Sequence, residues 1–402
     1  MYSIHKLTST PTYFFMPKRI VFEVNGALKL GNELQLLGVE KGSKVFLVLD
    51  PAIKGLEHPL KTVKSLEESG YVVDVYTDVE YEPTIECLKR AVSYVRNDDF
   101  KAVVGIGGGS TLDIAKVSAA AKDNPNRNVE EFIGMDKIPK RVTPIIALPT
   151  TAGTASEVSR FTVFTRGVGK VGINGYNVLP DIAVVDPVFT YTLPPKVTAG
   201  TGLDALSHAV EGMISLDATP MSDALGFIAV ELVFKYLRRA YYRGSDVEAR
   251  YFMSLAATSA GAPLNIGRAI LGHSISQTFG PQFKVHHGTA CGMVLPYIME
   301  FYLPAVPEKL AAIAKAAGVD TSGMKIKDAA EEAVKATWKL VEDLDVPLSL
   351  RDVGISKSDL ETLAERSVKE WPRPNSPIEL TKERVLKVVE AMYEGRLMKI
   401  KT

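Results

Sequence analysis

Short apolar runs alternate with segments of helical spacing through the first half of the chain. The runs are rich in β-branched residues and end at polar residues or glycine, as buried strands do. They lie at residues 45–49, 71–76, 102–106, 145–148 and 182–185. Helices are predicted between them at 59–69 and 83–96. Continuous apolar strands separated by helices predict a parallel, Rossmann-like sheet covered on both faces.

The pattern changes after Asp186 and Pro187, where strand signals nearly vanish. Helical spacing predicts helices at 199–216, 220–242, 247–262, 307–318, 326–344, 357–370 and 382–394. Residues 371–377 hold three prolines and predict a structured loop between two of these helices. We therefore expect an α/β domain at 1–187 and an all-helical domain at 188–402.

Composition narrows the classes of function. Lys plus Arg equals Asp plus Glu, 47 each, so no global field attracts nucleic acid or an anionic membrane. Cys87 and Cys291 are the only cysteines, which excludes a disulfide framework and favours a reducing compartment. No run of about 18 apolar residues occurs. We expect a soluble cytoplasmic protein with neither a nucleic-acid nor a membrane partner.

Three consecutive glycines follow the strand at 102–106 and open a helical segment. Gly107, Gly108 and Gly109 are expected to adopt positive φ and to let the backbone approach an anion closely. Their amides and the positive end of the next helix would bind a pyrophosphate, with Ser110 as a further donor. The alternative is a tight turn that binds nothing.

Two further strand ends carry polar side chains. Asp50 follows the first predicted strand, where a carboxylate would accept from both ribose hydroxyls, repel a 2′-phosphate and so favour NAD over NADP. Its alternative role is a turn cap before Pro51. A second loop follows the strand at 145–148 and carries four hydroxyls, those of Thr150, Thr151, Thr154 and Ser156. Such loops suit ligand contact at the carboxyl edge of a parallel sheet, although ordinary capping would also use them.

Four of the chain's possible metal ligands lie in the second half. Asp204 and His208 are four apart, so one helix face would carry both. His273 and His287 are separated by Gly280–Pro281, which must end a helix, so His287 is expected on a turn that Gly288 frees to aim it. Spacing alone leaves a hydrogen-bonded Asp–His pair and a core histidine as alternatives.

Taken together, these strings resemble the iron-containing (group III) alcohol dehydrogenase family over nearly the whole chain, from Phe15 to the C-terminal helices. The resemblance covers the glycine loop with Asp113 and Lys116, residues 149–157, Lys170, and residues 180–187, 201–211 and 273–288. It implies a nucleotide-binding N-terminal domain and a helical domain that binds metal and substrate. The implied metal ligands are Asp204, His208, His273 and His287, usually for iron(II), with zinc or another divalent ion as alternatives. The implied cofactor contacts are Asp50, Gly107, Gly108, Gly109, Ser110, Asp113, Thr150, Thr151, Thr154, Ser156 and Lys170.

The function implied by this resemblance is reversible hydride transfer between a small primary or secondary alcohol and NAD(P), NAD being favoured. The ion would act as a Lewis acid on the substrate oxygen. A homo-oligomer, for instance a dimer, is also expected. The alternatives are a metal-independent reductase of the same superfamily, a dehydroquinate-synthase-like lyase that uses NAD catalytically, and a non-catalytic nucleotide-binding or metal-storage protein.

The expected catalytic positions are His273, His287, Gln277 and His286, and two of them depart from the family pattern. Many members carry a histidine near the substrate where this chain has Gln277, which does not titrate. His286 stands where proline is common, and we hypothesise that it serves as a base that supports a ligand or relays a proton. Cys291 is a candidate for the substrate pocket near the metal, and packing is favoured over a catalytic role for it.

Overall fold

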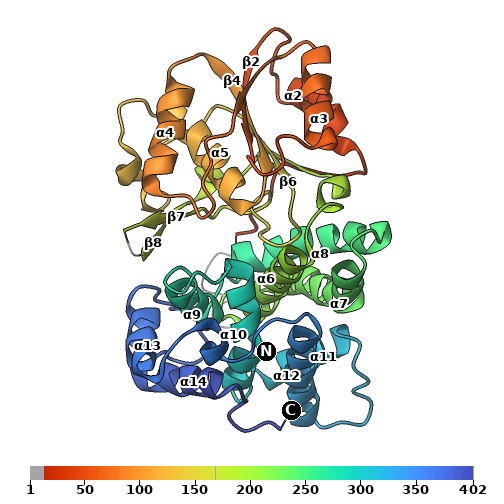
Figure 1. Cartoon of the computed structure of the whole chain (residues 1–402), viewed down its shortest axis with the longest axis vertical. Helices are drawn as coiled ribbons and strands as arrows, with labels where there is room; N and C mark the ends of the chain where they lie inside the picture. The colour runs from red at the N-terminus through yellow and green to blue at the C-terminus, as the bar shows by residue number, and fades with distance from the viewer. Residues whose placement is uncertain (1–12, 168, 402) are drawn as a thin grey trace. The chain divides into compact units, whose positions relative to one another are not determined.

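The computed structural model describes residues 13–167 and 169–401. The chain folds into two compact units, which we call the α/β unit, Phe15–Thr192, and the helical unit, Leu193–Thr402 (Figure 1). The expected fold class, a parallel-sheet α/β region followed by a helical region, is confirmed. The assignment of separate roles to residues 1–187 and 188–402 stays a prediction.

The α/β unit is built on a six-stranded sheet in the order β1-β9-β6-β4-β2-β3, with every neighbouring pair parallel. Its strands are β1 (Arg19–Phe22), β2 (Lys44–Leu49), β3 (Val72–Tyr76), β4 (Phe100–Gly107), β6 (Ile145–Pro149) and β9 (Ile182–Val185). A second, small sheet contains β5 (Gly134–Met135), β7 (Val163–Arg166) and β8 (Gly169–Asn174). The sequence predicts neither β1 nor this second sheet.

Helices cover both faces of the large sheet because alternate residues of each strand face opposite sides. Phe46 and Val48 of β2 pack in one core with α4 (Ile85–Arg96) and α5 (Gly109–Lys122). Val45, Leu47 and Leu49 of β2 pack in the other core with α2 (Leu30–Leu36) and α3 (Glu57–Glu68) (Figure 1).

The chain reverses direction across this sheet between β2 and β4. From β2 it runs outward to β3 and then returns to β4 on the other side of β2. The register pairs Leu49 with Ile106 and Gly107 with Pro149, so the carboxyl ends of β2, β4 and β6 lie along one edge. Open α/β sheets bind ligands at the switch point, where the order of the strands reverses. There β2 leads into Asp50, and β4 leads into the glycine loop, residues 107–109. β6 leads into residues 150–157, which carry the four hydroxyl side chains and which we call the hydroxyl loop.

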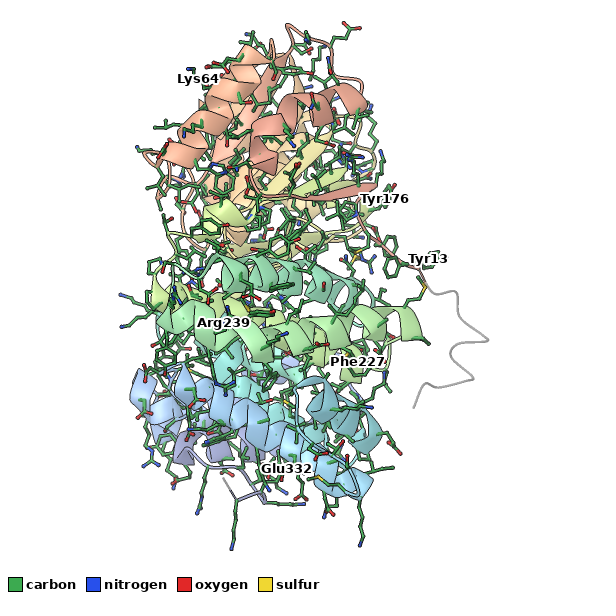
Figure 2. All side chains as sticks on the ribbon, turned by 90° about the vertical axis from the view of Figure 1, so that its right-hand side faces the viewer. Tyr13, Lys64, Tyr176, Phe227, Arg239 and Glu332 are labelled. Carbon is green, nitrogen blue, oxygen red and sulfur yellow. The ribbon has the colours of Figure 1, made fainter. Side chains whose placement is uncertain are left out.

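The helical unit contains nine α-helices among its described residues. They are α6 (Pro195–Ile214), α7 (Pro220–Tyr242), α8 (Val247–Ile266), α9 (Leu271–Phe279), α10 (His287–Tyr302), α11 (Pro307–Ala316), α12 (Ile326–Asp343), α13 (Leu360–Lys369) and α14 (Lys382–Glu394). Side chains fill the space between them, as Figure 2 shows around Phe227 and Arg239 of α7 and Glu332 of α12. None of the described helices is both long and apolar enough to cross a bilayer.

Two glycines on α6 and one on α10 allow three other helices to approach α6 closely. A Cβ at Gly202 would lie 2.3 Å from Leu237 of α7, and one at Gly212 would lie 2.4 Å from the Pro263 carbonyl of α8. A Cβ at Gly288, in α10, would lie 2.3 Å from the Gly200 carbonyl of α6. The helix of Asp204 and His208 is thereby held at the centre of the helical unit.

Two helices that carry candidate residues differ from the expectation. The sequence predicts neither α9 nor α10, and places His287 on a turn. Instead, His287 is the first residue of α10 and His286 is its N-cap. Gly288 is needed for the close approach to α6 rather than for turning the backbone, because its φ is not left-handed.

Candidate functional site

Three helices of the helical unit bring the predicted metal ligands together. Oδ1 of Asp204 lies 3.6 Å from Nε2 of His208 and 3.7 Å from Nε2 of both His273 and His287. The His208 and His273 rings stack with their centroids 4.8 Å apart. Asp204, His208 and His273 are buried, while the His287 side chain is 29% exposed. Four side chains from three separate helices thus form one group, which we call the donor group.

The spacing of these four atoms fits a metal ion better than it fits hydrogen bonds. Donors about 2.1 Å from a tetrahedral ion lie about 3.5 Å from one another. A direct contact is much shorter: His58 Nε2 and Asp186 Oδ2 are 2.8 Å apart in the α/β unit. Oδ1 of Asp204 is buried and has no hydrogen-bond partner among the described residues. An orphaned carboxylate oxygen facing three imidazole nitrogens is the donor set that a divalent ion requires.

Glu211 orients one of these imidazoles; it ends the segment 201–211 that resembles the family, but the sequence analysis assigns it no role. Its Oε1 lies 2.6 Å from Nδ1 of His273, and its Oε2 accepts from the backbone amides of Ile270, at 2.8 Å, and His273, at 3.3 Å. Burial on its own would raise the pKa of Glu211, but His273 outweighs burial and holds the pKa below its usual value. A carboxylate behind a histidine fixes the tautomer that presents Nε2 to an ion.

Cys291 also belongs to this donor group, although the sequence places it only as a packed pocket residue near the metal and not as a possible ligand. Its Sγ lies 3.6 Å from Nε2 of His287, 3.8 Å from Nε2 of His273 and 3.3 Å from Oγ of Ser276. One donor atom from each of Asp204, His273, His287 and Cys291 lies within 4.8 Å of the others. The i, i+4 spacing from His287 is the signal for this placement, but it is visible only once α10 is known to be a helix.

The glycine loop of the α/β unit joins β4 to α5 as expected, but its backbone conformation differs from the prediction. None of Gly107, Gly108 and Gly109 has positive φ, so the prediction of left-handed backbone is wrong. The reason for glycine is steric: a Cβ on Gly107 would lie 2.5 Å from the Thr111 side chain, and one on Gly109 3.0 Å from Thr154. The α5 N-terminus carries no acidic side chain in its first turn, which suits an anion there.

The other cofactor candidates gather around this loop. The amide of Thr150 donates to the Gly107 carbonyl at 3.0 Å. Oγ1 of Thr151 is buried beside Gly108 and has no hydrogen-bond partner in the described part of the chain, so it is open to a ligand. Lys170 is linked to the glycine loop through Glu82. Nζ of Lys170 lies 3.0 Å from Oε2 of Glu82, and the backbone amide of Glu82 donates to Oγ of Ser110.

Asp50 lies at the end of β2, where its amide donates to the Ile106 carbonyl at 3.0 Å. Its Oδ1 accepts from the Ala52 amide at 2.9 Å, so the turn-cap role is present. The turn cap involves Oδ1 of Asp50. The carboxylate still places its negative charge at the switch point.

Two of the expected cofactor contacts are used to hold the hydroxyl loop in place. Ser156 Oγ donates to Asp113 Oδ1 at 2.7 Å, and Asp113 Oδ2 accepts from the Val163 amide at 2.8 Å. The buried Lys116 donates to Ser156 Oγ and O, both at 3.0 Å, and to the Phe161 carbonyl at 2.7 Å. Burial lowers the pKa of Lys116 to about 8 and raises that of Asp113. This network ties α5 to the loop that carries Thr150 and Thr151.

Comparison with known proteins decides the family. Residues 17–187 match the model described as iron-containing alcohol dehydrogenase, and residues 198–393 match the C-terminal model of the Fe-containing alcohol dehydrogenase family. The chain belongs to the iron-containing alcohol dehydrogenase family. The family, the fold class and the class of enzyme expected from the sequence, an NAD(P)-dependent alcohol dehydrogenase, are confirmed.

Individual relatives of this iron-containing alcohol dehydrogenase extend over nearly the whole chain. Long-chain-alcohol dehydrogenase 1 of Geobacillus thermodenitrificans is 34% identical over 378 residues, 93% of this chain and 95% of the relative. NAD-dependent methanol dehydrogenase of Bacillus methanolicus is 30% identical over 381 residues, 94% of this chain and 99% of the relative. The structure of an alcohol dehydrogenase from Oenococcus oeni matches with a TM-score of 0.91 at 31% identity, covering 95% of this chain and 100% of that one.

The two departures from the family pattern lie on the elements of the donor group. Gln277 is one turn beyond His273 on α9, and its Oε1 accepts from Nη2 of Arg373 at 3.3 Å. His286, at the start of α10, packs against α6, where a Cβ on Gly200 would lie 3.5 Å from its Nδ1. Both side chains are half-buried. Their catalytic roles stay predictions.

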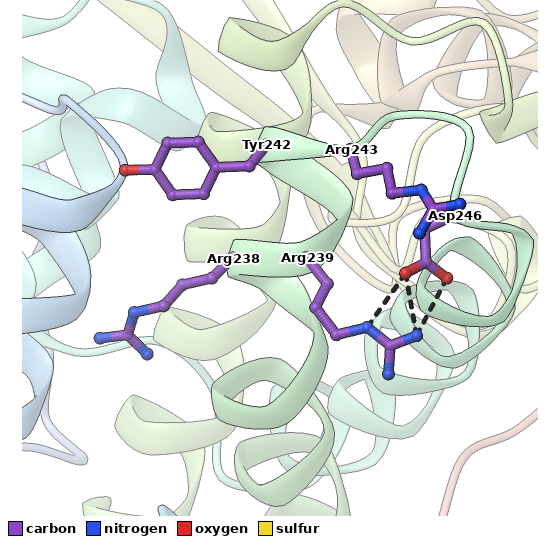
Figure 3. A pocket seen from close by; sticks show the side chains of 5 residues that line it. All are labelled: Arg238, Arg239, Tyr242, Arg243 and Asp246. Carbon is purple, nitrogen blue, oxygen red and sulfur yellow. Dashed lines mark hydrogen bonds and ion pairs between the residues drawn. The ribbon is translucent and has the colours of Figure 1, made fainter.

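A surface hollow of about 430 Å³ lies apart from this donor group (Figure 3). It is lined by Arg238, Arg239, Tyr242, Arg243 and Asp246, at the C-terminal end of α7. Arg239 is bound to Asp246, as the dashed lines in Figure 3 show, and Arg238 is bound to Asp343. None of the sequence-predicted site residues lines it.

Proposed function

We propose that this alcohol dehydrogenase moves hydride reversibly between a small primary or secondary alcohol and NAD(P), with one divalent ion held by Asp204, His208, His273 and His287. The observation that carries the proposal is the buried Oδ1 of Asp204, 3.6–3.7 Å from three imidazole nitrogens and without a hydrogen bond among the described residues. When bound, the ion would supply a Lewis acid that polarises the substrate oxygen. Iron(II) is the first expectation, from the family; zinc is the main alternative.

The chain's own residues have separate tasks in this proposal. Asp204 offsets part of the ion's charge, and Glu211 fixes the orientation of His273. The amides at the start of α5 and the hydroxyl of Thr151 would bind the cofactor's pyrophosphate. Gln277 has no titratable proton, so a proton that leaves the substrate needs another acceptor, and His286 is our candidate. An unaltered pH–rate profile in His286→Ala would dismiss that role.

NAD is proposed over NADP because Asp50 places a negative charge at the sheet's switch point. The NAD-dependent methanol dehydrogenase among the relatives supports the same choice. Asp50→Asn keeps an acceptor for the Ala52 amide and removes the charge. We expect the ratio of kcat/KM with NAD to that with NADP to fall about tenfold, equivalent to about 1.4 kcal/mol of lost repulsion. An unchanged ratio would show that Asp50 only caps the turn.

The metal is tested by elemental analysis of the purified protein. NAD(P)H formation is measured against a panel of alcohols, before and after chelation. We expect one divalent ion per chain, and loss of both the ion and the activity in Asp204→Ala. The matched control is His58→Gln, which removes the imidazole from a partly buried Asp–His contact in the α/β unit and should retain both.

The outcomes separate the rival functions. Full turnover after removal of the metal would support a metal-independent reductase. Alcohol-dependent turnover at background in the metal-loaded protein would support a non-catalytic nucleotide-binding protein. Cofactor-dependent conversion without net NADH would support a lyase.

We further propose a cytoplasmic homo-oligomer. The two cysteines support the compartment, since both are buried free thiols. Light scattering of the purified protein measures the oligomeric state, and a monomeric mass would contradict the proposal.

A further inference from the structure

Arg373 extends from the proline-containing loop between α13 and α14 to the helix of His273. Its Nε donates to Oγ of Ser274 at 2.9 Å, and its Nη2 donates to Oε1 of Gln277 at 3.3 Å. In the described part of the chain no carboxylate oxygen lies within 4.0 Å of this guanidinium, and Nη1 has no protein acceptor. The half-buried Arg373 guanidinium also lies over the Trp371 ring, 5.8 Å from its centroid, but the ring carries no net charge that could balance it. A guanidinium shielded from water is normally paired with an anion, so the missing carboxylate needs an explanation.

The loop that carries Arg373 is fixed on both sides. Before Arg373, the Trp371 carbonyl accepts from Oγ of Ser274 at 3.0 Å. After it, the side-chain amide of Asn375 donates to the Gly267 carbonyl at 2.9 Å, and Ser376 is hydrogen-bonded to Tyr302 at 2.7 Å. Arg373 is therefore held beside α9 rather than free to swing into solvent.

Gln277 offers a second donor at the same place. Its amide oxygen faces Arg373, which can only donate, so its NH₂ group points elsewhere. That group has no acceptor among residues 13–167 and 169–401. The amide of Gln277 and Nη1 of Arg373 thus form a pair of open donors one helical turn from His273.

The charges around α9 do not compensate Arg373. The acidic group that acts on it most strongly is Glu211, whose two oxygens are already used by His273 and Ile270. The charges of a divalent ion would be offset by Asp204 and Glu211. Arg268 is bound to Asp217. Burial lowers the pKa of Arg373 only to about 10, so it stays charged at neutral pH. One positive charge is left over for a ligand.

We propose that Arg373 and Gln277 bind the anionic end of the substrate, so that the enzyme acts on small alcohols or aldehydes that carry a carboxylate or sulfonate. The inference rests on the proposed function, because it names the substrate class of the same site. A planar fork of donors suits a carboxylate or sulfonate, and an arginine pair of this kind is specific for such groups.

Matched pairs of aldehydes test the proposal in the metal-loaded enzyme with NADH. Glyoxylate is compared with acetaldehyde, and 4-oxobutanoate with butanal. We expect the anionic member of at least one pair to have a kcat/KM about tenfold or more above its neutral partner, the size of one charge-assisted hydrogen-bond pair. Arg373→Met should remove this preference mainly through KM, and Arg373→Lys should retain part of it.

A second variant tests the same preference for anionic substrates without changing Arg373. Gln277→Glu places a carboxylate next to Arg373 and should also abolish the preference for anions. Arg366→Met is the control, because Arg366 of α13 is already bound to Glu370, just after that helix, and it should behave as the wild type. A wild-type enzyme that prefers the neutral members, or an Arg373→Met that slows both members equally, would overturn the proposal.

Calorimetry separates this inference from the proposed function. Propane-1-sulfonate is titrated into metal-loaded wild type, Arg373→Met and Arg366→Met, with propan-1-ol as the neutral probe. We expect sulfonate binding about tenfold weaker in Arg373→Met alone. Equal binding in all three proteins would overturn the anion site even if alcohol oxidation is active. Selective binding without any turnover would support the site and contradict the dehydrogenase proposal.

Discussion

Asp204 and Glu211 show at the residue scale how two carboxylates on one helix take different roles through their neighbours. Both are buried on α6. Glu211 is saturated by His273 and Ile270, whereas Oδ1 of Asp204 faces three imidazoles without a hydrogen bond in the described structure. The spacing of Asp204 and His208 was predictable, because both lie on one helix. The partner of Glu211 lies 62 positions away, and no local pattern could indicate that contact.

Glu211→Gln should weaken ion binding without removing any proposed ligand. The amide keeps an acceptor for His273 but loses the charge behind the ring, which typically costs about 10-fold to 100-fold in metal affinity. The affinity is measured by competition with a coloured chelator. Glu300→Gln is the control, because Glu300 is also a buried carboxylate and, among the described residues, accepts only from the backbone amides of Met398, Lys399 and Ile400. Equal losses in the two variants would reduce Glu211 to a general structural role.

At the scale of elements, the sequence was most informative where local signals and packing agree. The helix predicted over 220–242 is observed with the same bounds as α7, since Thr219 caps it and Pro220 begins it. The strands of continuous apolar residues were predictable for the same reason. β1 was missed because its apolar run, Ile20–Phe22, is only three residues long and its side chains are exposed or half-buried. β8 was missed because it begins with Gly169 and is interrupted by Gly172.

Helix α10 was missed because tertiary packing overrides its low helical propensity. Gly288, Gly292 and Pro296 all lie within it, and each disfavours a helix. The structure gives a reason for the glycines, since a Cβ on Gly292 would lie 2.5 Å from Leu203. The candidate ligands His273 and His287 were therefore beyond prediction from spacing, and only the resemblance over the whole chain indicated them.

Gly288→Ala should push α10 away from α6 and displace the neighbouring His287. We expect about 1–3 kcal/mol lower stability, typical of overpacking, together with a lower metal content. Urea unfolding and elemental analysis measure the two effects. Gly55→Ala is the control, because a Cβ there meets no atom within 4 Å and φ is not left-handed. Unchanged metal binding in Gly288→Ala would mean that the position of His287 does not depend on the close approach of the helices.

At the scale of the whole molecule, a net charge of zero conceals local imbalances that the composition could not indicate. The donor group and Glu211 concentrate negative charge in the helical unit, and Arg373 stands near them without a carboxylate within ion-pair distance in the described chain. In the α/β unit, Asp181 is the opposite case. It accepts from Lys18 at 2.8 Å, from the Ile145 amide at 3.0 Å and from Arg141, so it joins the starts of β6 and β9 through charge.

The ion pairs of Asp181 predict how the stability of the α/β unit depends on pH. Burial on its own would raise the pKa of Asp181, but Arg141 and Lys18 outweigh burial and hold it below the usual value. Because the pKa is lower in the folded chain than in the unfolded chain, the ionised carboxylate stabilises the fold above the unfolded pKa. That stabilisation is lost as the pH falls through the folded pKa.

Asp181→Asn should therefore lower the free energy of unfolding by about 3 kcal/mol at pH 7, the cost of leaving Arg141 without its buried partner. The gap between wild type and variant should narrow as the pH falls below about 4, the usual pKa of an aspartate, because the unfolded wild-type chain then takes up a proton before the folded chain does. Urea unfolding from pH 7 to pH 3 measures this gap. The exposed Asp99, bound to Lys101, provides the control, because Asp99→Asn should change the stability far less at any pH. A gap that stays constant or widens on acidification would show that Asp181 stabilises the sheet through hydrogen bonds alone, independently of its charge.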